Sequence, residues 1–364
     1  MSGTLKIIIG IIIVAVIGLG VGLTIHHFAT GKTTAANQSA NQQSQDTNTS
    51  IDLPASSNSF AWGITVLTFP FPTYEPAFTG TQMTEAKKLG VGYIRVDYVP
   101  GNPKATDLAV SDAGKQGLKV VLIIPYGPKD IFSDTNLTQN TTNYVKDLVN
   151  HYKGKVAIYQ LGTEAASVAL NNNAALSGID LKDYPTAKLN AVTTWVAQAA
   201  KTVKQTDPSA KTLVNDQWVH VGFFDNYFAK GGDFDILGWN WFSDMGTSMD
   251  RVTIDASKNQ YYDLMSKLTS YHKPIWLTEV NRRLGSQGGH EQDAANFINT
   301  MASYALKQPT IKGFFVFNLL GDQAAPPQEQ GYGIINAADN GKSQTITGEK
   351  VPFTTYQSII TNNK

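Results

Sequence analysis

Two glutamates each follow a short apolar run, and together they could carry out acid/base and nucleophilic chemistry. Glu164 closes the run Ile-Tyr-Gln-Leu-Gly-Thr, and Glu279 closes the run Pro-Ile-Trp-Leu-Thr. Glycosidic cleavage needs one carboxylic acid to protonate the leaving oxygen and a second carboxylate to attack the anomeric carbon or to activate a water. A separation of about 5 Å between the carboxylates predicts retention, and about 6.5–9.5 Å predicts inversion. The alternative for either glutamate is an ion pair at the end of a strand.

The elements that must position these glutamates alternate along the chain. From Phe60 onward, short β-branched runs alternate with longer amphipathic stretches, the pattern of β-α units and a parallel sheet. We expect strands at 60–66, 93–97, 119–124, 157–161, 212–215, 236–239, 274–278 and 313–317. We expect helices at 81–89, 107–116, 141–151, 188–206, 261–271 and 291–306.

Eight such units predict an α/β fold, a closed (β/α)8 TIM barrel, with Glu164 after the fourth strand and Glu279 after the seventh. Active sites of such barrels lie at the carboxyl ends of the strands, so the two glutamates are expected to share one opening. A doubly wound open sheet is the alternative architecture. It would need a glycine-rich phosphate loop after the first strand, where Gly63 stands alone.

The segments around these residues resemble clan A of the glycoside hydrolases, the retaining (β/α)8 enzymes, over roughly residues 60–359. Trp-Leu-Thr-Glu279 is similar to the nucleophile motif of the clan, and Gly-Thr-Glu164 to its acid/base motif. The resemblance implies that Glu279 attacks, that Glu164 protonates, and that Arg95 orients the nucleophile. The stretch 234–242 resembles the sixth strand of the clan, and 332–356 resembles its C-terminal hairpin and last helix.

Two positions depart from the clan pattern. Thr163 stands where most members have asparagine before the acid/base, although some β-mannanases are similar in carrying Gly-Thr-Glu. Phe242 replaces the tyrosine that usually touches the nucleophile, which removes a hydroxyl. The nucleophile is then held by Arg95 and another partner such as Asn240 or Tyr126, or the site is impaired.

Aromatic residues at predicted strand ends could stack on sugar rings, because the C–H faces of pyranoses pack against flat apolar surfaces. Trp218 and Trp241 are the best candidates, ahead of Trp239, Phe69, Phe71 and Tyr74. The full predicted substrate-binding set is Arg95, Thr163, Asn240, Trp241, Trp218, Tyr126 and Tyr332. Asp97, Asn215, Asp216 and Asn318 could also bind hydroxyls, or could only cap loops.

Composition excludes several other functions. The chain has no cysteine, which removes disulfides and thiolate chemistry, and its histidines lack metal-binding spacing. Neither a G-x-S-x-G elbow nor a Walker sequence is present. We therefore expect no cofactor and no metal. Formal net charge is zero and charged residues make up 16% of the chain, which argues against nucleic acid as a partner.

The N-terminus carries a targeting signal. Residues 5–25 form an uncharged and almost wholly apolar run of 21 residues, long enough to span a bilayer as a helix. We expect a membrane anchor over 1–27, a flexible polar stalk over 28–57 and a catalytic domain over 58–364, monomeric and outside the cell. The alternative is secretion after cleavage of a signal peptide, but the run is longer than the usual apolar region and no clean cleavage site follows.

The expected function is retaining hydrolysis of a β-linked glycan, of the β-mannanase, glucanase or xylan type. A carbohydrate is thus the expected partner. A glycan-binding barrel without turnover is the alternative of another class, and a surface transglycosylase would use the same two carboxylates. Sequence does not choose among these glycans, because the loops decide them.

Overall fold

A computed structural model describes residues 60–364 except 69–75, 129, 174, 324–326, 328 and 341–342. The predicted anchor and stalk lie outside the described residues, as do Phe69, Phe71 and Tyr74. None of the helices in the described part of the chain is long and apolar enough to cross a membrane.

Within the described residues, parallel strands close into a barrel in the order β1-β10-β9-β6-β5-β4-β3-β2. These strands are β1 (Ala61–Thr65), β2 (Tyr93–Asp97), β3 (Lys119–Ile124), β4 (Ile158–Leu161), β5 (Lys211–Gln217), β6 (Ile236–Phe242), β9 (Ile275–Asn281) and β10 (Ile311–Val316). The predicted TIM barrel is confirmed, and all eight predicted strands are present.

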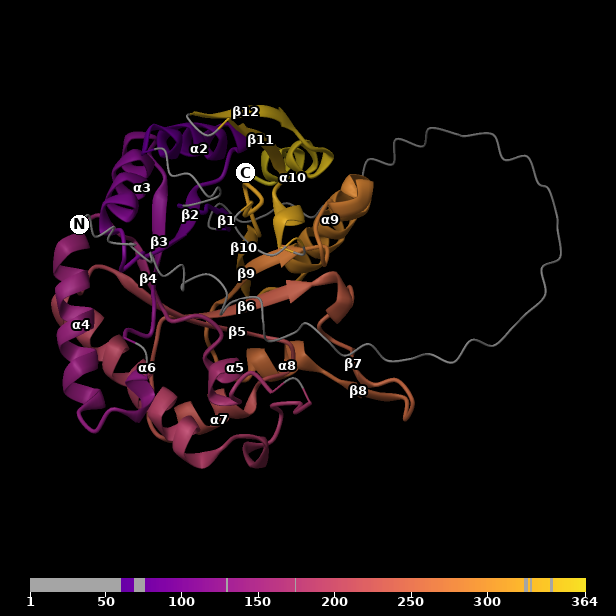
Figure 1. Ribbon diagram of the computed structural model, residues 1–364. Helices are drawn as coiled ribbons and strands as arrows, with labels where there is room; N and C mark the ends of the chain where they lie inside the picture. The colour runs from indigo at the N-terminus through magenta and orange to yellow at the C-terminus, as the bar shows by residue number, and fades with distance from the viewer. Residues whose placement is uncertain are drawn as a thin grey trace, which may run out of the picture.

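Helices surround the barrel (Figure 1). They are α2 (Pro76–Leu89), α3 (Pro103–Lys115), α4 (Leu137–Tyr152), α5 (Ala165–Ala169), α6 (Thr186–Thr206), α7 (Gly222–Ala229), α8 (Leu264–Thr269), α9 (Glu291–Lys307) and α10 (Val351–Asn362). The sequence of α6 shows why they pack there. Val192, Trp195, Val196, Ala199 and Val203 recur at helical spacing and are buried, so one face of the helix is apolar and covers the strands.

The barrel interior is apolar near the starts of the strands and polar toward their carboxyl ends. Val121, Ile158, Leu213, Trp276 and Phe315 form a separate buried cluster inside the barrel. Side chains alternate between the two faces of a strand. The residues two positions further along β4 and β5 therefore also face inward, and these are the amides Gln160 and Asn215.

A bulge in β9 changes this alternation beside the site. Asn240 pairs with Glu279, whereas the preceding residue of β6, Trp239, pairs with Leu277, so one residue of β9 is extra. Leu277 and Val280 both belong to the core outside the barrel. Bulges re-aim side chains next to active sites, and this one lets both Thr278 and Glu279 face inward.

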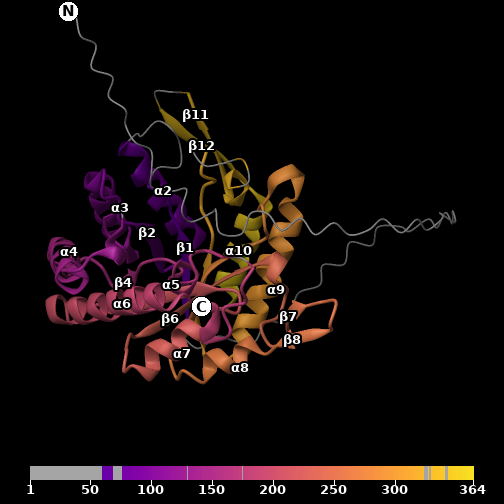
Figure 2. The same cartoon turned by 60° about the horizontal axis from the view of Figure 1, so that its bottom comes forward.

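Two antiparallel hairpins extend from the barrel and its helices (Figure 2). One is β7 (Val252–Asp255) with β8 (Gln260–Tyr262), and the other is β11 (Ile335–Asp339) with β12 (Gln344–Glu349). The second confirms the predicted C-terminal hairpin, and α10 follows it. The predicted helix 261–271 is wrong at its start, because Tyr261 and Tyr262 belong to β8. Asp263 then caps α8 by accepting a hydrogen bond from the Ser266 amide at 2.9 Å.

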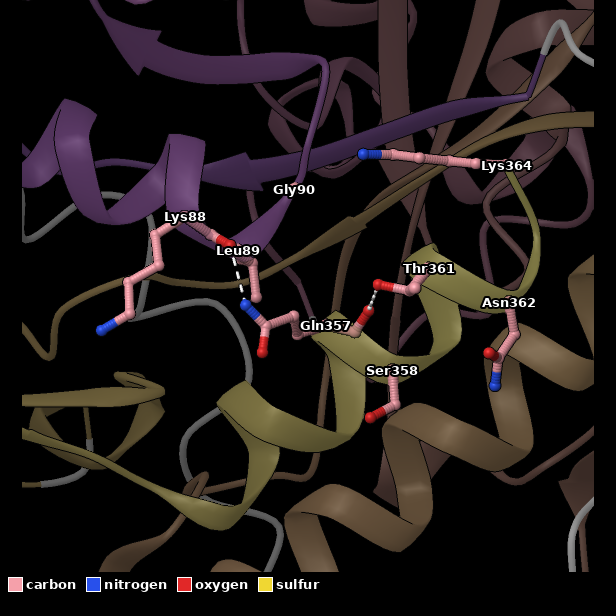
Figure 3. A pocket seen from close by; sticks show the side chains of 8 residues that line it. All are labelled: Lys88, Leu89, Gly90, Gln357, Ser358, Thr361, Asn362 and Lys364. Atoms are coloured by element: carbon pink, nitrogen blue, oxygen red, sulfur yellow. Dashed lines mark hydrogen bonds between the residues drawn. The ribbon is translucent and has the colours of Figure 1, made fainter.

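The base of the barrel, where the strands begin, is lined by both ends of the described chain. Phe60 and Lys364 line the same pocket, which has a volume of about 410 Å³. A neighbouring pocket of about 400 Å³ lies between the end of α2 and α10 (Figure 3). There Gln357 donates to the Lys88 carbonyl at 2.8 Å. Both pockets lie at the end of the barrel opposite to Glu164, because their residues precede β1 and β2 or end α10.

Candidate active site

Glu279 lies inside the barrel beside a guanidinium. The carboxylate is buried, with 3% of the residue exposed, and its Oε1 is 2.8 Å from Nη2 of Arg95. Arg95 is itself buried, and its Nε donates to Oε1 of Gln160 at 2.7 Å. The structure therefore places Arg95 against Glu279, as the resemblance implied, and away from solvent.

Glu164 lies immediately before α5 and carries two amide hydrogen bonds. Gln217 donates to its Oε2 at 2.8 Å, and Asn240 donates to its Oε1 at 3.0 Å. Its backbone is left-handed, with φ of 51°. Such a conformation costs of order 1 kcal/mol or more in a residue with a side chain and persists where neighbouring groups fix it. As a whole residue Glu164 is half-buried, whereas Glu279 is buried.

A chain of buried amides connects the two glutamates. Gln160 donates to Oδ1 of Asn215 at 3.0 Å, and Asn215 donates to Oδ1 of Asn240 at 3.1 Å. Thr278 donates to the same Asn240 oxygen at 2.8 Å, which leaves the Asn240 NH₂ group for Glu164. Because each amide is oriented by its neighbours, the network fixes which atoms face Glu164.

The two carboxyls have different electrostatic environments. Burial raises the pKa of Glu164 well above its usual range, and the negative charges of Glu279 and Asp216 raise it further. Burial also raises the pKa of Glu279, but the adjacent Arg95 opposes that effect. The first proton therefore leaves Glu279, and Glu164 keeps its proton to higher pH.

Two residues predicted to contact sugar, Trp241 and Tyr332, are buried. Trp241 is fully buried and donates from Nε1 to the Gly246 carbonyl at 2.8 Å. It follows the inward-facing Asn240 by one residue, so it points to the helical layer. Tyr332 is 2% exposed, and its ring packs against Phe242 and Phe317. Neither aromatic ring offers a free face for stacking.

The remaining predicted contacts lie around the opening. Trp218 is half-buried after β5 and keeps its place as a stacking candidate. Tyr126 donates to the Thr163 carbonyl at 3.1 Å, so it supports the loop before Glu164. Asn240 is buried and donates to Glu164. Of the partners predicted for the nucleophile, the structure thus shows Arg95 in contact with Glu279.

Two polar residues near the glutamates were missed by sequence reasoning. Gln217 could have been found, because it is two residues beyond Asn215 on the same strand and so shares its inward face. Arg283 lies over the Phe242 ring at 4.3 Å and pairs with Asp244 at 3.1 Å. Its charge lowers the pKa of Glu164 slightly against the larger raising effects. No motif in the sequence marked it.

No group of three or more His, Cys, Asp or Glu residues in the described part of the chain could hold a metal ion. The side chains around Glu164 and Glu279 carry carboxyl, amide and guanidinium groups. These are groups that transfer protons, attack carbon and bind hydroxyls.

Replacing Arg95 by methionine is expected to lower kcat/KM by about 10²-fold or more, because Glu279 would lose its buried counter-charge. The pKa of Glu279 would rise further, so the acidic limb of the kcat/KM profile should move to higher pH. Arg95→Lys retains the charge and should show a smaller shift. An unchanged acidic limb in folded Arg95→Met would contradict the assigned role.

Replacing Gly162 by alanine is expected to cost about 2–4 kcal/mol of unfolding free energy. Gly162 has φ of +69°, and an added Cβ would lie 2.2 Å from the ring of Tyr126. Gly117 is the matched control, because it has φ of +68° with nothing within 4 Å of its Cβ position. Gly117→Ala should cost only about 1 kcal/mol. Urea unfolding of both variants measures the difference, and equal losses would show that the Tyr126 contact is unimportant.

Comparison with known proteins supports the same class of enzyme. Residues 186–336 match the family model described as the glycosyl hydrolase catalytic core. The family 1 β-glucosidase from Thermotoga maritima superposes with a TM-score of 0.63 at 14% identity, covering 86% of this chain and 99% of that chain. The β-glucosidase from Thermotoga maritima in complex with cyclophellitol gives 0.62 at 14% identity, covering 84% and 98%.

At this identity, the likeness to these solved structures shows a common fold. No curated protein matches the chain in sequence. The matched catalytic-core segment contains β5, β6 and β9, and therefore Asn240 and Glu279. Residues 186–336 thus match the glycosyl hydrolase catalytic core, and the barrel has the same fold as the superposed β-glucosidases.

Proposed function

We propose that the barrel hydrolyses a β-linked glycan with retention of anomeric configuration, with Glu279 as nucleophile and Glu164 as acid/base. The observation that carries the proposal is the pairing of a buried, arginine-bound Glu279 with a Glu164 whose pKa is raised well above its usual range. The charge of Glu279 is close enough to contribute to that rise. A pair with one ionised and one protonated carboxyl fits the nucleophile and the acid of glycosidic cleavage.

In the first step, a Glu279 oxygen attacks the anomeric carbon while the bond to the leaving oxygen breaks. Glu164 gives its proton to that oxygen, so the departing sugar leaves as an alcohol. In the second step, the Glu164 carboxylate takes a proton from water, and the water oxygen attacks the anomeric carbon. The Glu279 carboxylate is released, and Glu164 is protonated again.

The pH dependence of kcat/KM is expected to be bell-shaped. Glu279 must be ionised, so the rate rises as pH rises through its pKa. Glu164 must be protonated, so the rate falls as pH rises through its own pKa. Because burial and two negative neighbours raise the pKa of Glu164, the falling limb should lie well above the value of about 4.3 for an ordinary glutamate. A falling limb near that value would contradict the assigned acid.

A direct test uses polysaccharides and product stereochemistry. The domain beginning at residue 58 is screened against β-glucan, β-mannan, xylan and galactan, and hydrolysis of one of them is expected. Proton NMR of the first product then shows the anomeric configuration. Retention supports the proposal, and inversion would overturn the double displacement. Because the superposed structures are β-glucosidases, β-glucosides are the first substrates to test.

A mechanism-based 2-fluoro glycosyl fluoride separates turnover from binding alone. Covalent labelling of Glu279, located by peptide mass spectrometry, is expected of the hydrolase. Binding without labelling would favour a glycan-binding barrel without turnover. Phe242 and Thr163, which depart from the clan pattern, suggest that alternative. Longer oligosaccharides formed with acceptor sugars would instead indicate a transglycosylase.

For location, we infer that residues 5–25 anchor the barrel outside the cell. The length and apolar character of that run support this. Protease treatment of intact cells is expected to release the domain, whereas protection until lysis would place it inside.

A further inference from the structure

The end of β5 holds the Glu164 segment from both faces of the sheet. Facing the interior, Asn215 accepts from the backbone N–H of Glu164 at 3.0 Å, and Gln217 donates to its carboxyl at 2.8 Å. Asp216 lies between them in sequence, so it points outward, to the layer that contains α5. Three consecutive residues of one strand thus contact the acid/base or the helix that follows it.

Asp216 binds the first turn of α5. Its Oδ2 accepts from the backbone N–H groups of Ala166 and Ser167. The first N–H groups of a helix lack partners within it and are usually bound by the side chain just before the helix. That residue is Glu164, whose side chain makes no such bond. Asp216 supplies the cap, and the Glu164 carboxyl remains in the site.

Asp216 is fully buried and has a specific side-chain partner. Its Oδ1 lies 2.9 Å from Nδ1 of His220 and 3.2 Å from Oγ of Ser167. His220 is buried to about seven-eighths, with 12% of its side chain exposed. A buried carboxylate with this many donors keeps its position, so α5 and the Glu164 backbone are fixed with it.

We propose that Asp216, oriented by His220, is the positioning residue of the acid/base, holding Glu164 in its left-handed conformation and placing a fixed negative charge behind it. The inference rests on the proposed role of Glu164. The charge of Asp216 raises the pKa of Glu164, so Asp216 has two effects. It places the carboxyl, and it keeps the proton on it.

The charged groups around Glu164 come from several elements. Glu279 faces it from β9, Asp216 from β5 and Arg283 from the segment after β9, while Tyr126 faces it from the segment after β3. Arg283 favours the ionised form, and the two acidic groups favour the protonated form. Asp216 is the acidic neighbour that takes no part in the reaction, so its charge can be removed without removing a reacting group.

Asp216→Asn is the test, because it keeps the shape and removes the charge. The alkaline limb of kcat/KM is expected to move to lower pH by roughly one unit. On unsubstituted phenyl glycosides, kcat/KM should fall by about tenfold or more, because phenol is a poor leaving group that needs a proton. On 2,4-dinitrophenyl glycosides, which need little protonation, the fall should be much smaller. An equal loss on both substrates with an unmoved limb would overturn the proposal.

Carbon-13 NMR of labelled glutamate carboxyls gives a second readout that needs no turnover. The Glu164 signal, assigned by its absence in Glu164→Gln, should titrate at lower pH in Asp216→Asn than in the wild type. An unchanged titration would overturn the proposal even if the enzyme proved inactive on every glycan. Failure of the proposed function is a different result, namely a wild-type domain without turnover or labelling.

Asp235→Asn is the matched control. Asp235 also accepts from a backbone amide, that of Thr212 at 2.7 Å, but at the start of β6 and so at the opposite end of the barrel. It should lower stability without moving the alkaline limb. If Asp216→Asn does not fold, Asp216→Ser keeps a cap acceptor without the charge, and the same two measurements apply to it.

Discussion

The Glu279→Ala variant is expected to lose hydrolysis, with kcat/KM lower by about 10⁴-fold or more. Glu279 is the carboxylate that the proposed mechanism uses to attack the anomeric carbon. The buried carboxylate is held by Arg95 at 2.8 Å, and the bulge in β9 aims it into the barrel. Removing it takes away the oxygen that forms the glycosyl-enzyme in the proposed mechanism. Steady-state kinetics on the substrate found in the polysaccharide panel measure the loss.

Azide distinguishes a lost nucleophile from a damaged fold. A small anion can occupy the space of the deleted side chain in Glu279→Ala and attack from the same side as the carboxylate. With an activated β-glycoside, this yields the α-glycosyl azide. Glu291→Ala, which alters a carboxylate that accepts from the Val351 amide, is the control and should retain activity. Undiminished hydrolysis by folded Glu279→Ala would refute the assignment.

The Glu164→Ala variant is expected to lose activity according to the leaving group. For glycosides with poor leaving groups, kcat/KM should fall by about 10²–10⁴-fold, the usual contribution of general acid catalysis. For 2,4-dinitrophenyl glycosides, kcat/KM should change little, because that leaving group departs without a proton. The alkaline limb should disappear, since the group that loses its proton there is gone.

The second step of Glu164→Ala supplies a further check. Without a base, water attacks the glycosyl-enzyme slowly, so kcat on dinitrophenyl substrates should fall although kcat/KM does not. Azide should restore kcat and give the β-glycosyl azide, the opposite anomer to that from Glu279→Ala. Loss that is the same on every leaving group would mean that Glu164 has only a structural role.

The periodic features of the barrel could be predicted from the sequence. Runs of β-branched residues predict the strands. Glu164 and Glu279 stand out because each is an acidic residue directly after such a run. Glu279 and Arg95 lie together because the parallel strands of a barrel all end at the same opening. The barrel itself is predicted from the eight β-α units. The position of Glu164 after the fourth strand follows in the same way.

The details that orient the site could not be predicted. The bulge of β9 depends on pairing with both neighbouring strands, so no local signal reveals that Glu279 faces inward after Thr278. Trp241 seemed a sugar platform because it follows a strand end, but β6 extends to Phe242 and the alternation turns the ring outward. The contact between His220 and Asp216 could not be predicted, because it forms only after the chain turns beyond β5.

Phe60 and Lys364 lie close together at the base of the barrel, and this determines how the domain can be attached to a surface or to another protein. Because both ends of the described chain leave from the face opposite Glu164 and Glu279, a linkage at either end leaves the opening directed outward. A barrel tethered by its N-terminal segment would present its catalytic mouth to the surroundings rather than to the lipid. For the same reason, the domain could be attached to a bead or fused to a second module without covering the opening that contains Glu164 and Glu279.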